Sequence, residues 1–464
     1  NARDYYLSGR TLDSLPFDIA GMRPPGALVA IDGAQAGEAI RRRPEAGLAR
    51  DLGEVTFTPE FSPDGSYLRV QTGPDTWLIT DGARDITLPP LEVLPEFSPR
   101  ESKAVFSTAE GAFVIDLADG RVTRVGDSAH SVSFSADGST LLLHVSGQPA
   151  RIVDIGTGAV RAVAASQTPP VFSPDGVWLA GWRSVTDAFA MNLRTGASWR
   201  LGRFSSERTA FVFSPDSHFL LTIGPNDIWQ LMDLRTGLEI PLGAFEGFGP
   251  RFTSNSRWLV GIESPDRVFV MDLRSGQRLS SFESAADIEL ASDGDTIALM
   301  AADDSLIVNL ATGQTRDLGE TLHSISFGTD AATVMAQDAT DSASVYDLGT
   351  GAVIVELGQT YGYPAFTVDG RRVAARSMDG ITYVIDLETG VRADLGFSMD
   401  TRSNGAELSG DGRMHAMWDR ARGGFAFDLD RMFAKLAQGV AGSDLCNGET
   451  GALARSFPPD IRGD

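Results

Sequence analysis

The sequence predicts an all-β fold built from about ten four-stranded sheets, and two recurrent motifs are the basis of this prediction. The first motif is an aromatic residue or Leu, a small polar residue and a tight polar turn, as in FSPDG. The second is an apolar run closed by Asp or Asn, Leu, any residue, Thr or Ser, and Gly, written DLxTG below. The first motif recurs every 36 to 42 residues, at Phe61, Phe97, Phe134, Phe172, Phe213, Phe252, Leu290, Phe327, Phe366 and Leu408. The second keeps the same period, at Asp116, Asp154, Asn192, Asp233, Asp272, Asn309, Asp347 and Asp386, with weaker copies at Asp81 and Asp428.

Each repeat contains four short strand-like runs joined by turns. In residues 131–163, SVSFS and STLLLHV flank the turn Ala136-Asp137-Gly138, where Gly can adopt positive φ and Asp can accept a bond from the turn backbone. A polar turn then leads to RIVDI, and a Gly-Thr-Gly turn leads to AVRAVAA. These runs are too short for ordinary helices, so each repeat predicts an antiparallel sheet of four strands.

A sheet this small cannot cover both of its faces, so neighbouring copies must stack and share a core. Radial stacking of such sheets gives a β-propeller, in which each sheet is one blade. Large side chains two positions after the first turn would fill the space between blades: Tyr67, Trp178, Phe219 and Trp258. A functional aromatic box is the alternative interpretation of these residues. Ten repeats fit a single ring, which we favour, and also two smaller rings, such as five blades plus five.

The segments outside the repeats are expected to close the ring. Residues 58–430 hold the ten repeats, residues 1–57 precede them, and residues 431–464 follow them. The last repeat supplies three strand-like runs and then RMFAKLAQGV, whose apolar spacing predicts a short C-terminal helix. We therefore expect residues 1–57 to supply the missing fourth strand, from residues 5–12 or 27–31.

The composition excludes several classes of protein. With 42% hydrophobic and 22% charged residues, the chain is too apolar for a disordered protein, and its 50 Gly and 23 Pro indicate many turns. The 39 Lys and Arg against 62 Asp and Glu give a net charge of −23, which argues against nucleic acid as a partner. A single Cys, Cys446, excludes an intramolecular disulfide. The sequence has no apolar run long enough to span a membrane and no signal-peptide pattern in NARDYYLSGR, so we expect a cytoplasmic location, with a periplasmic one as the alternative.

The sequence assigns no catalytic, cofactor-binding or metal-binding residue. It lacks a G-x-S-x-G elbow, a His-Glu-x-x-His pair and a phosphate-binding loop. The five histidines belong to separate repeats: His130, His144, His218, His323 and His415. The carboxylates of the first turns, such as Asp137, Asp175 and Asp216, are expected to accept hydrogen bonds from turn amides. We therefore predict that the protein is not an enzyme and holds no cofactor.

Over residues 58–430, the two motifs resemble those of bacterial WD-repeat-like and TolB-like β-propellers, whose blades carry FSPDG between the first two strands and DLxTG between the last two. The sequence departs from the strict WD repeat, because Ile, Val, Met or Tyr takes the place of Trp before the DLxTG Asp. Through RSFPPDIR, the tail is similar to C-terminal extensions of bacterial proteins in which a WD-like propeller follows an effector domain. The resemblance implies a fold but no particular activity.

In the geometry that the resemblance implies, the turns between second and third strands lie on the face opposite the motif turns. Most of these turns carry acids: Asp75, Glu110, Asp187, Asp227, Glu263, Asp266, Asp303, Asp304, Asp338, Asp341, Asp379 and Asp419. They predict a negatively charged rim, which would attract a protein partner with a basic surface. Solvated loops that keep an acidic protein soluble are the alternative interpretation.

These observations favour a non-catalytic protein-interaction or sensor propeller, acting as a scaffold for a protein partner. We expect it to be the C-terminal recognition part of a larger bacterial protein, with an effector domain before Asn1. One alternative is a propeller enzyme, a lyase or hydrolase with its site at the channel mouth. The other is a periplasmic binding propeller of the TolB type.

Overall fold

The computed structural model describes residues 60–428 and Phe433, apart from a set of gaps. The gaps are residues 64–65, 74–75, 82–83, 185–186, 202–210, 224–227, 246–248, 264–266, 280–284, 302–304, 319–321, 368–369, 379–380, 399–404, 409–413, 420–422 and 429–432. The predicted N-terminal strand within residues 1–57 lies outside the described residues. The predicted C-terminal helix also lies outside them, except for Phe433, whose backbone is helical. The domain boundaries at residues 58 and 430 therefore stay predictions.

The described strands form ten antiparallel sheets, which confirms the predicted all-β propeller of about ten blades. Nine sheets have four strands, and the last has three among its described residues. In every sheet the strands lie side by side in sequence order, so each sheet is one repeat. The chain divides into two compact units, Leu91–Phe327 and a second one that joins Asn1–Pro90 to Gly328–Asp464. The choice between one ring and two stays a prediction.

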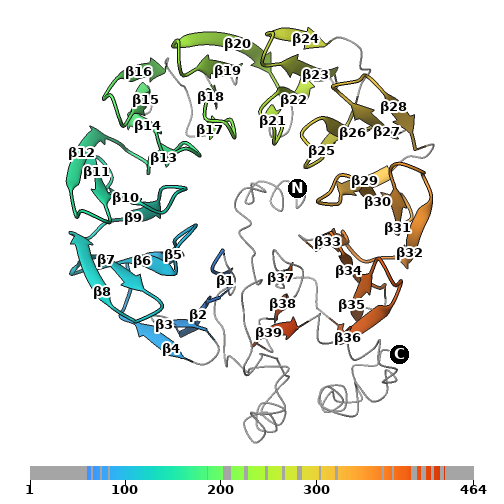
Figure 1. Ribbon diagram of the computed structural model, residues 1–464, viewed down its shortest axis with the longest axis horizontal. Coiled ribbons are helices and arrows are strands. Elements are labelled where there is room, and N and C mark those ends of the chain that lie inside the picture. The colour runs from blue at the N-terminus through green and yellow to red at the C-terminus, as the bar shows by residue number, and fades with distance from the viewer. Residues whose placement is uncertain are drawn as a thin grey trace, which may run out of the picture. The chain divides into compact units, whose positions relative to one another are not determined.

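The unit Leu91–Phe327 holds six complete sheets, which Figure 1 draws side by side with each first strand on the inner side and each fourth strand on the outer side. Their strands are β5 (Val93–Phe97), β6 (Lys103–Thr108), β7 (Gly111–Asp116) and β8 (Val122–Gly126); β9 (Ser131–Phe134), β10 (Thr140–His144), β11 (Pro149–Asp154) and β12 (Val160–Ala165); β13 (Val171–Phe172), β14 (Trp178–Ser184), β15 (Asp187–Asn192) and β16 (Ser198–Leu201); β17 (Val212–Phe213), β18 (Phe219–Ile223), β19 (Ile228–Asp233) and β20 (Leu238–Ala244); β21 (Arg251–Phe252), β22 (Trp258–Glu263), β23 (Arg267–Asp272) and β24 (Gln277–Leu279); β25 (Asp287–Leu290), β26 (Thr296–Met300), β27 (Ser305–Asn309) and β28 (Thr315–Asp317). Strand β29 (Leu322–Phe327) ends this unit.

The other unit contains the first sheet of the chain and the last strands. The first sheet comprises β1 (Glu60–Phe61), β2 (Leu68–Gly73), β3 (Thr76–Thr80) and β4 (Asp85–Leu88). The later strands are β30 (Thr333–Asp338), β31 (Ser342–Asp347) and β32 (Val353–Gln359), which continue the sheet of β29; β33 (Ala365–Phe366), β34 (Arg372–Arg376), β35 (Ile381–Asp386) and β36 (Arg392–Ser398); and β37 (Gly405–Leu408), β38 (Met414–Asp419) and β39 (Gly423–Asp428).

The FSPDG turn folds tightly because its polar side chains bond to its own backbone. Gly138 has a φ of 73°, and Asp137 Oδ1 accepts the Ser139 amide at 3.0 Å, as the sequence predicted. The buried Ser135 hydroxyl adds two bonds, donating to Asp137 at 2.6 Å and accepting the Thr140 amide at 3.0 Å. The same pattern recurs around Ser173, Ser214 and Thr253. These turns therefore use their polar groups for local structure.

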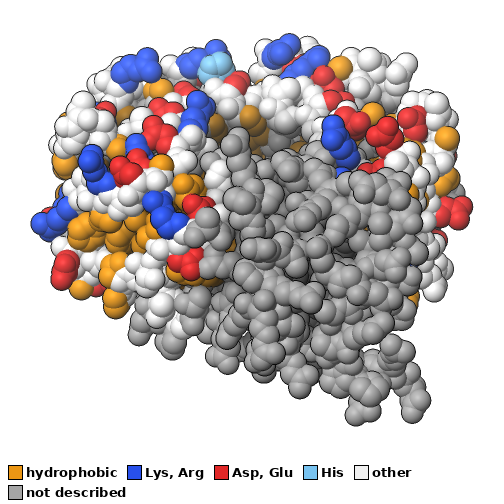
Figure 2. Space-filling view, turned by 60° about the horizontal axis from the view of Figure 1, so that its bottom comes forward, with side chains coloured by type: hydrophobic (Ala, Val, Ile, Leu, Met, Phe, Trp, Pro, Cys, Tyr) orange, Lys and Arg blue, Asp and Glu red, His pale blue; other side chains and the backbone are white. Residues whose placement is uncertain are grey.

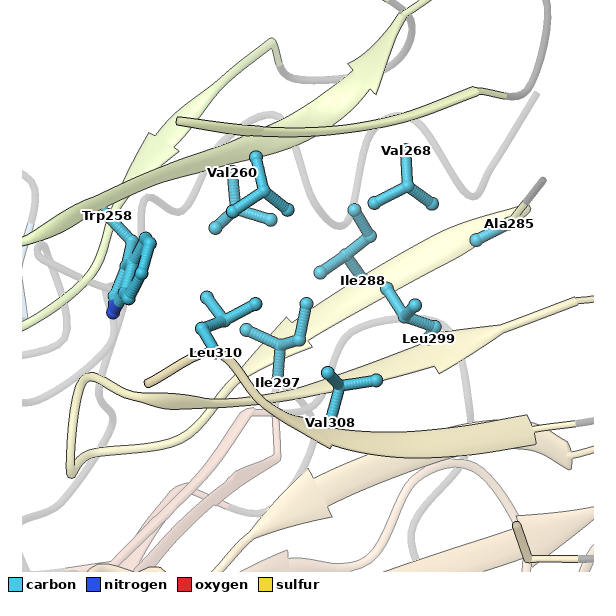
Figure 3. Close-up of a cluster of buried hydrophobic side chains, with 10 residues drawn as sticks. Trp258, Val260, Val268, Ala285, Ile288, Ile297, Leu299, Val308 and Leu310 are labelled. Carbon is cyan, nitrogen blue, oxygen red and sulfur yellow. The ribbon is translucent and has the colours of Figure 1, made fainter. Parts of the chain in front are cut away.

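Side chains of the middle strands alternate between two cores, one on each side of the sheet. In β22 and β23, one set packs against β25 to β27 (Figure 3): Trp258, Val260, Val268 and Val270 contact Ile288, Ile297, Leu299 and Val308. The other set, which includes Leu259, Phe269 and Met271, packs against Leu221 and Leu231 of the preceding sheet. Each fully buried side chain of this kind contributes about 1.5–3 kcal/mol. The sheets are thus held together by shared cores, as predicted.

The predicted aromatic positions belong to these cores and form no aromatic box. Trp258 is 3% exposed and Tyr67 is 9% exposed, and Trp178 and Phe219 pack against clusters that join consecutive sheets. In β34 the equivalent position is Arg372, which is 6% exposed and lies 3.5 Å from the Asp386 carboxylate. The Arg372 guanidinium lies 4.9 Å from the ring centroid of Phe433. A cation thus replaces the aromatic side chain in this sheet, and the segment after the last strand supplies the ring.

Candidate interaction site

Two described acids of the predicted negative rim, Asp187 and Glu263, are paired with arginines. Asp187 accepts a hydrogen bond from Arg200 Nε at 3.0 Å. Glu263 is 9% exposed and pairs with Arg267 at 2.8 Å and Arg278 at 3.0 Å. Six acids of the rim lie outside the described residues: Asp75, Asp227, Asp266, Asp303, Asp304 and Asp379. At Asp187 and Glu263, the paired arginines therefore offset part of the negative charge that the sequence predicted.

The turn carboxylates of a cavity between two neighbouring sheets are also engaged. The cavity has a volume of about 550 Å³ and lies among the motif turns of the sheets β9–β12 and β13–β16. The Ser135 hydroxyl holds the pKa of Asp137 below its ordinary value, and the Thr157 hydroxyl does the same for Asp154. Both carboxylates stay ionised near neutral pH and already accept bonds from their turns.

The described part of the chain holds neither a cluster of metal-ligating side chains nor a membrane-spanning helix. There, no three His, Cys, Asp or Glu side chains gather in an arrangement that could hold a metal ion. His144 is 2% exposed, and its Nε2 lies 3.0 Å from the Ser166 carbonyl oxygen. None of the helical structure in these residues is long and apolar enough to cross a membrane.

A small loop between β32 and β33 is held on a buried polar side chain. Gln337, at the end of β30, is 1% exposed, and its Nε2 donates to Thr360 Oγ1 at 3.0 Å and to the Gly362 carbonyl at 3.1 Å. Gly362 has a φ of 74°, which the tight turn of this loop requires. The Tyr361 amide donates to the Arg376 carbonyl at 2.7 Å. The loop is therefore fixed at several points.

Pairing of this loop with the end of β34 determines which side chains face solvent. Thr360 pairs with Ser377 in an antiparallel bridge, and Thr360 is fully buried. Because side chains alternate across a strand, Tyr361, Arg376 and Met378 share the other face. The Arg376 guanidinium lies 4.8 Å from the centroid of the Tyr361 ring. These three side chains form one surface.

This surface, together with Tyr363 two residues further along the same loop, is called the aromatic patch below. Tyr361 is 46% exposed, Tyr363 60% and Met378 55%. Nearby, the Thr340 hydroxyl donates to Asp338 at 2.7 Å and holds the pKa of that carboxyl below its ordinary value. The patch thus combines exposed apolar area with a cation and hydroxyl groups. These residues lie outside both repeat motifs, although the spacing of two tyrosines around Gly362 was a visible signal in the sequence.

Comparison with known proteins does not assign the chain to a family. No family model matches it, and no curated protein is similar to it in sequence. Among solved structures, the chain is similar to one titled "Crystal structure of the eukaryotic initiation factor", with a TM-score of 0.46 and 13% identity, covering 70% of this chain and 93% of that chain.

Proposed function

We propose that the protein is a non-catalytic protein-interaction propeller, and that the aromatic patch is a binding site for its protein partner. The observation that carries this proposal is the exposure of Tyr361, Tyr363 and Met378 above a buried, hydrogen-bonded frame. The engaged turn carboxylates support a non-catalytic role, because their acceptor positions already serve the turns.

The composition of the patch fits a protein interface. Tyr, Met and Arg are enriched in the cores of protein–protein interfaces, and Tyr and Arg are among the residues whose removal costs the most binding energy. Stacking of Arg376 on Tyr361 orders both side chains before a partner arrives. Tyrosine also offers a large contact area with few rotatable bonds. The patch can therefore contribute affinity without a large entropic cost.

The frame under the patch further reduces the cost of binding. Gln337 and Thr360 are buried, and their hydrogen bonds fix the loop backbone in one conformation. A partner therefore meets a surface that is ordered in advance, which favours affinity because less conformational entropy is lost on association.

We further propose that the protein is a cytoplasmic sensor of the bacterial WD-repeat-like type, with an effector domain before Asn1. The support for this proposal is the recurrence of FSPDG and DLxTG and the similarity of RSFPPDIR to the tails of such proteins. The sequence of the whole gene product tests it: a signal peptide before Asn1 would favour the periplasmic alternative, and a preceding effector domain would support the sensor.

The double variant Tyr361→Ala with Tyr363→Ala tests the binding site. The tagged protein is used to capture partners from an extract of the source organism, and each purified partner is then titrated by calorimetry. We expect the affinity of a true partner to fall at least about 30-fold, because central interface tyrosines contribute about 2 kcal/mol or more.

Val353→Ala is the matched control, since Val353 is 47% exposed on the outer strand β32 of the same unit. This control should bind the partner as tightly as the unchanged protein does, and both variants should melt at nearly the same temperature. A partner that binds the double variant with unchanged affinity would show that the patch is not its site.

A further inference from the structure

Three consecutive sheets carry an arginine at the same place in the turn between their third and fourth strands. The arginines are the third residues of the DLxTG motifs, Arg194, Arg235 and Arg274. At each turn the backbone amide of the arginine donates to the side-chain oxygen of the first motif residue, at 3.0, 2.8 and 2.8 Å respectively. Because the three backbones are held in the same way, the three side chains leave equivalent turns in equivalent directions. We call them the arginine row.

The row is exposed and stands above the turn acids. All three arginines are exposed, and basic side chains stand out along the upper edge of Figure 2. The side chain of Arg235 is 62% exposed, whereas that of the nearby Asp233, at 3.5 Å, is only 16% exposed. Among the described residues, no hydrogen bond or ion pair occupies the guanidinium groups of Arg194 and Arg274. The outermost charges of these turns are thus positive, in a chain whose net charge is −23.

The fold itself does not require arginine at this position. In other repeats the same place is occupied by small residues or by an acid: Ala118, Gly156, Ala311, Gly349 and Glu388. An equivalent internal bond forms without arginine: the Thr350 amide donates to Asp347 Oδ1 at 2.6 Å, as the Thr195 amide does to Asn192 Oδ1 at 2.9 Å. A side chain that the turn does not need, repeated on three neighbouring sheets, indicates a role outside the turn.

The cavity of about 550 Å³ lies at one end of the row. Its lining includes Arg194 and Arg161, together with the apolar side chains of Ile152, Val177 and Leu193. Arg161 Nη1 donates to the Leu193 carbonyl at 2.6 Å, so this guanidinium is fixed at the cavity wall. The cavity therefore offers an apolar wall and two cations to a ligand that follows the row. The carboxylates of Asp137, Asp154 and Asp175 also line it, and their oxygens accept bonds from their own turns.

We infer that the arginine row binds an extended, acidic polypeptide segment that places carboxylates on the three guanidinium groups and an aliphatic side chain in the cavity. Guanidinium and carboxylate groups pair through two parallel hydrogen bonds, which favours Asp and Glu as the ligand groups. An extended segment advances about 3.3 Å per residue and can cross several sheets. Nucleic acid is disfavoured, because three arginines release few counterions and the rest of the chain is acidic. This inference rests on the proposed protein-interaction role, but it concerns a second surface.

The test uses a labelled Glu-rich peptide of about ten residues with one central Leu, titrated with the full chain and followed by fluorescence anisotropy. The same peptide with Gln in place of Glu, and an oligothymidylate of the same length, are the comparison probes. In about 50 mM NaCl we expect the Glu peptide to bind at least about tenfold more tightly than either probe, and binding to weaken in about 300 mM NaCl.

Substitutions of the arginines then test whether the peptide binds at the arginine row. The triple variant Arg194→Gln, Arg235→Gln, Arg274→Gln should weaken binding at least about tenfold, and the corresponding Arg→Lys variant should recover only part of it, because Lys lacks the planar fork. The matched control removes three exposed arginines elsewhere in the same unit, Arg121→Gln, Arg200→Gln and Arg267→Gln, and should change binding less than about twofold.

Three results would overturn the inference. The first is that the triple arginine variant binds the Glu peptide as tightly as the unchanged protein does. The second is that the protein binds oligothymidylate more tightly than the Glu peptide. The third is that the variant Tyr361→Ala with Tyr363→Ala no longer binds the peptide. The last result would place the peptide on the aromatic patch. Normal peptide binding by that tyrosine variant, with unchanged capture of other partners, would instead overturn the proposed function and leave the arginine row intact.

Discussion

Replacing Glu289 by Gln should stabilise the protein at alkaline pH and leave its stability unchanged in mild acid. Glu289 lies on β25 with 28% of its side chain exposed, and burial raises its pKa to about 7. Arg251, whose Nη1 lies 3.9 Å from Glu289 Oε2, opposes this rise, and the charge of Asp287 adds to it. The native state thus holds a carboxyl group that resists ionisation.

The sign of the pH dependence follows from proton binding. The pKa of Glu289 is about 7 in the folded state and 4.5 at its ordinary value, so between these pH values the native state binds more protons than the unfolded state. The free energy of unfolding therefore falls as the pH rises through this window. At about 1.4 kcal/mol per pH unit the full penalty is about 3 kcal/mol. Because more than a quarter of the side chain meets solvent, which screens the charge, we expect about 1–2 kcal/mol.

The assay is urea unfolding of the unchanged protein and of Glu289→Gln at about pH 4 and about pH 8, monitored by hydrogen exchange of residues 285–301. Gln cannot ionise, so the variant should be more stable by about 1–2 kcal/mol at pH 8 and nearly equal at about pH 4, below both pKa values. Glu239→Gln, at an exposed position of β20, is the control and should show no such difference. A gain in stability of the same size at both pH values would refute the reasoning, because it would not come from ionisation.

Two further predictions concern the turns. Gly249 has a φ of 80°, and a Cβ there would lie 2.0 Å from the Trp229 ring, whereas Gly120 has a φ of 77° with open space around it. In thermal melts, Gly249→Ala should therefore lower the free energy of unfolding by at least about 3 kcal/mol, and Gly120→Ala by only about 1 kcal/mol. Equal losses would show that the Cβ at position 249 does not clash with the Trp229 ring. Ser217 has a φ of 61°, and its hydroxyl accepts the Asp175 amide of the preceding sheet at 3.0 Å. Ser217→Ala keeps the strain and loses the bond, so it should lower the free energy of unfolding by about 1–2 kcal/mol. Ser217→Gly also loses the bond but relieves the strain, so it should cost less; the reverse order would show that relief of the strain is smaller than the backbone entropy that Gly loses on folding.

The sequence was sufficient to predict the sheets, because each repeat contains the residue types that form its own turns. The positive φ of Gly138 and the amide bonds of Asp137 follow directly from the residue types. The role of Ser135 could not be predicted in the same way, since a serine hydroxyl can donate and accept in many local geometries. Only the closed turn shows that this hydroxyl joins Asp137 to the Thr140 amide.

Positions where the repeat varies were harder to predict. Ser256 occupies the place of the turn glycine, and its φ of 55° is strained for a residue with a Cβ. Its compensation comes from the preceding sheet, where the Asp216 amide donates to Ser256 Oγ at 2.9 Å. A bond between residues 40 positions apart depends on how two sheets stack, which no local pattern contains.

The aromatic patch shows the same limit at a functional site. Whether Tyr361 points to solvent or into the core depends on the pairing of Thr360 with Ser377, because a shift by one residue would exchange the two faces. The sequence contained the tyrosines but not this register. By contrast, the arginine row can be seen in the sequence alone, because its residues occupy position x of DLxTG, the one position where the motif specifies no residue type.

That contrast suggests where function should be sought in a repeat of this kind. The residues that recur in the two motifs form hydrogen bonds within their own turns. For example, Asp154 accepts bonds from the Thr157 amide and the Thr157 hydroxyl. A residue whose hydrogen-bonding groups are already used by its own turn has little left for a ligand. The open position of DLxTG, and the loop that joins one sheet to the next, are not constrained in this way. Both proposed surfaces lie at such places, so exchanging only these residues between repeats should move binding from one sheet to another while leaving the fold unchanged.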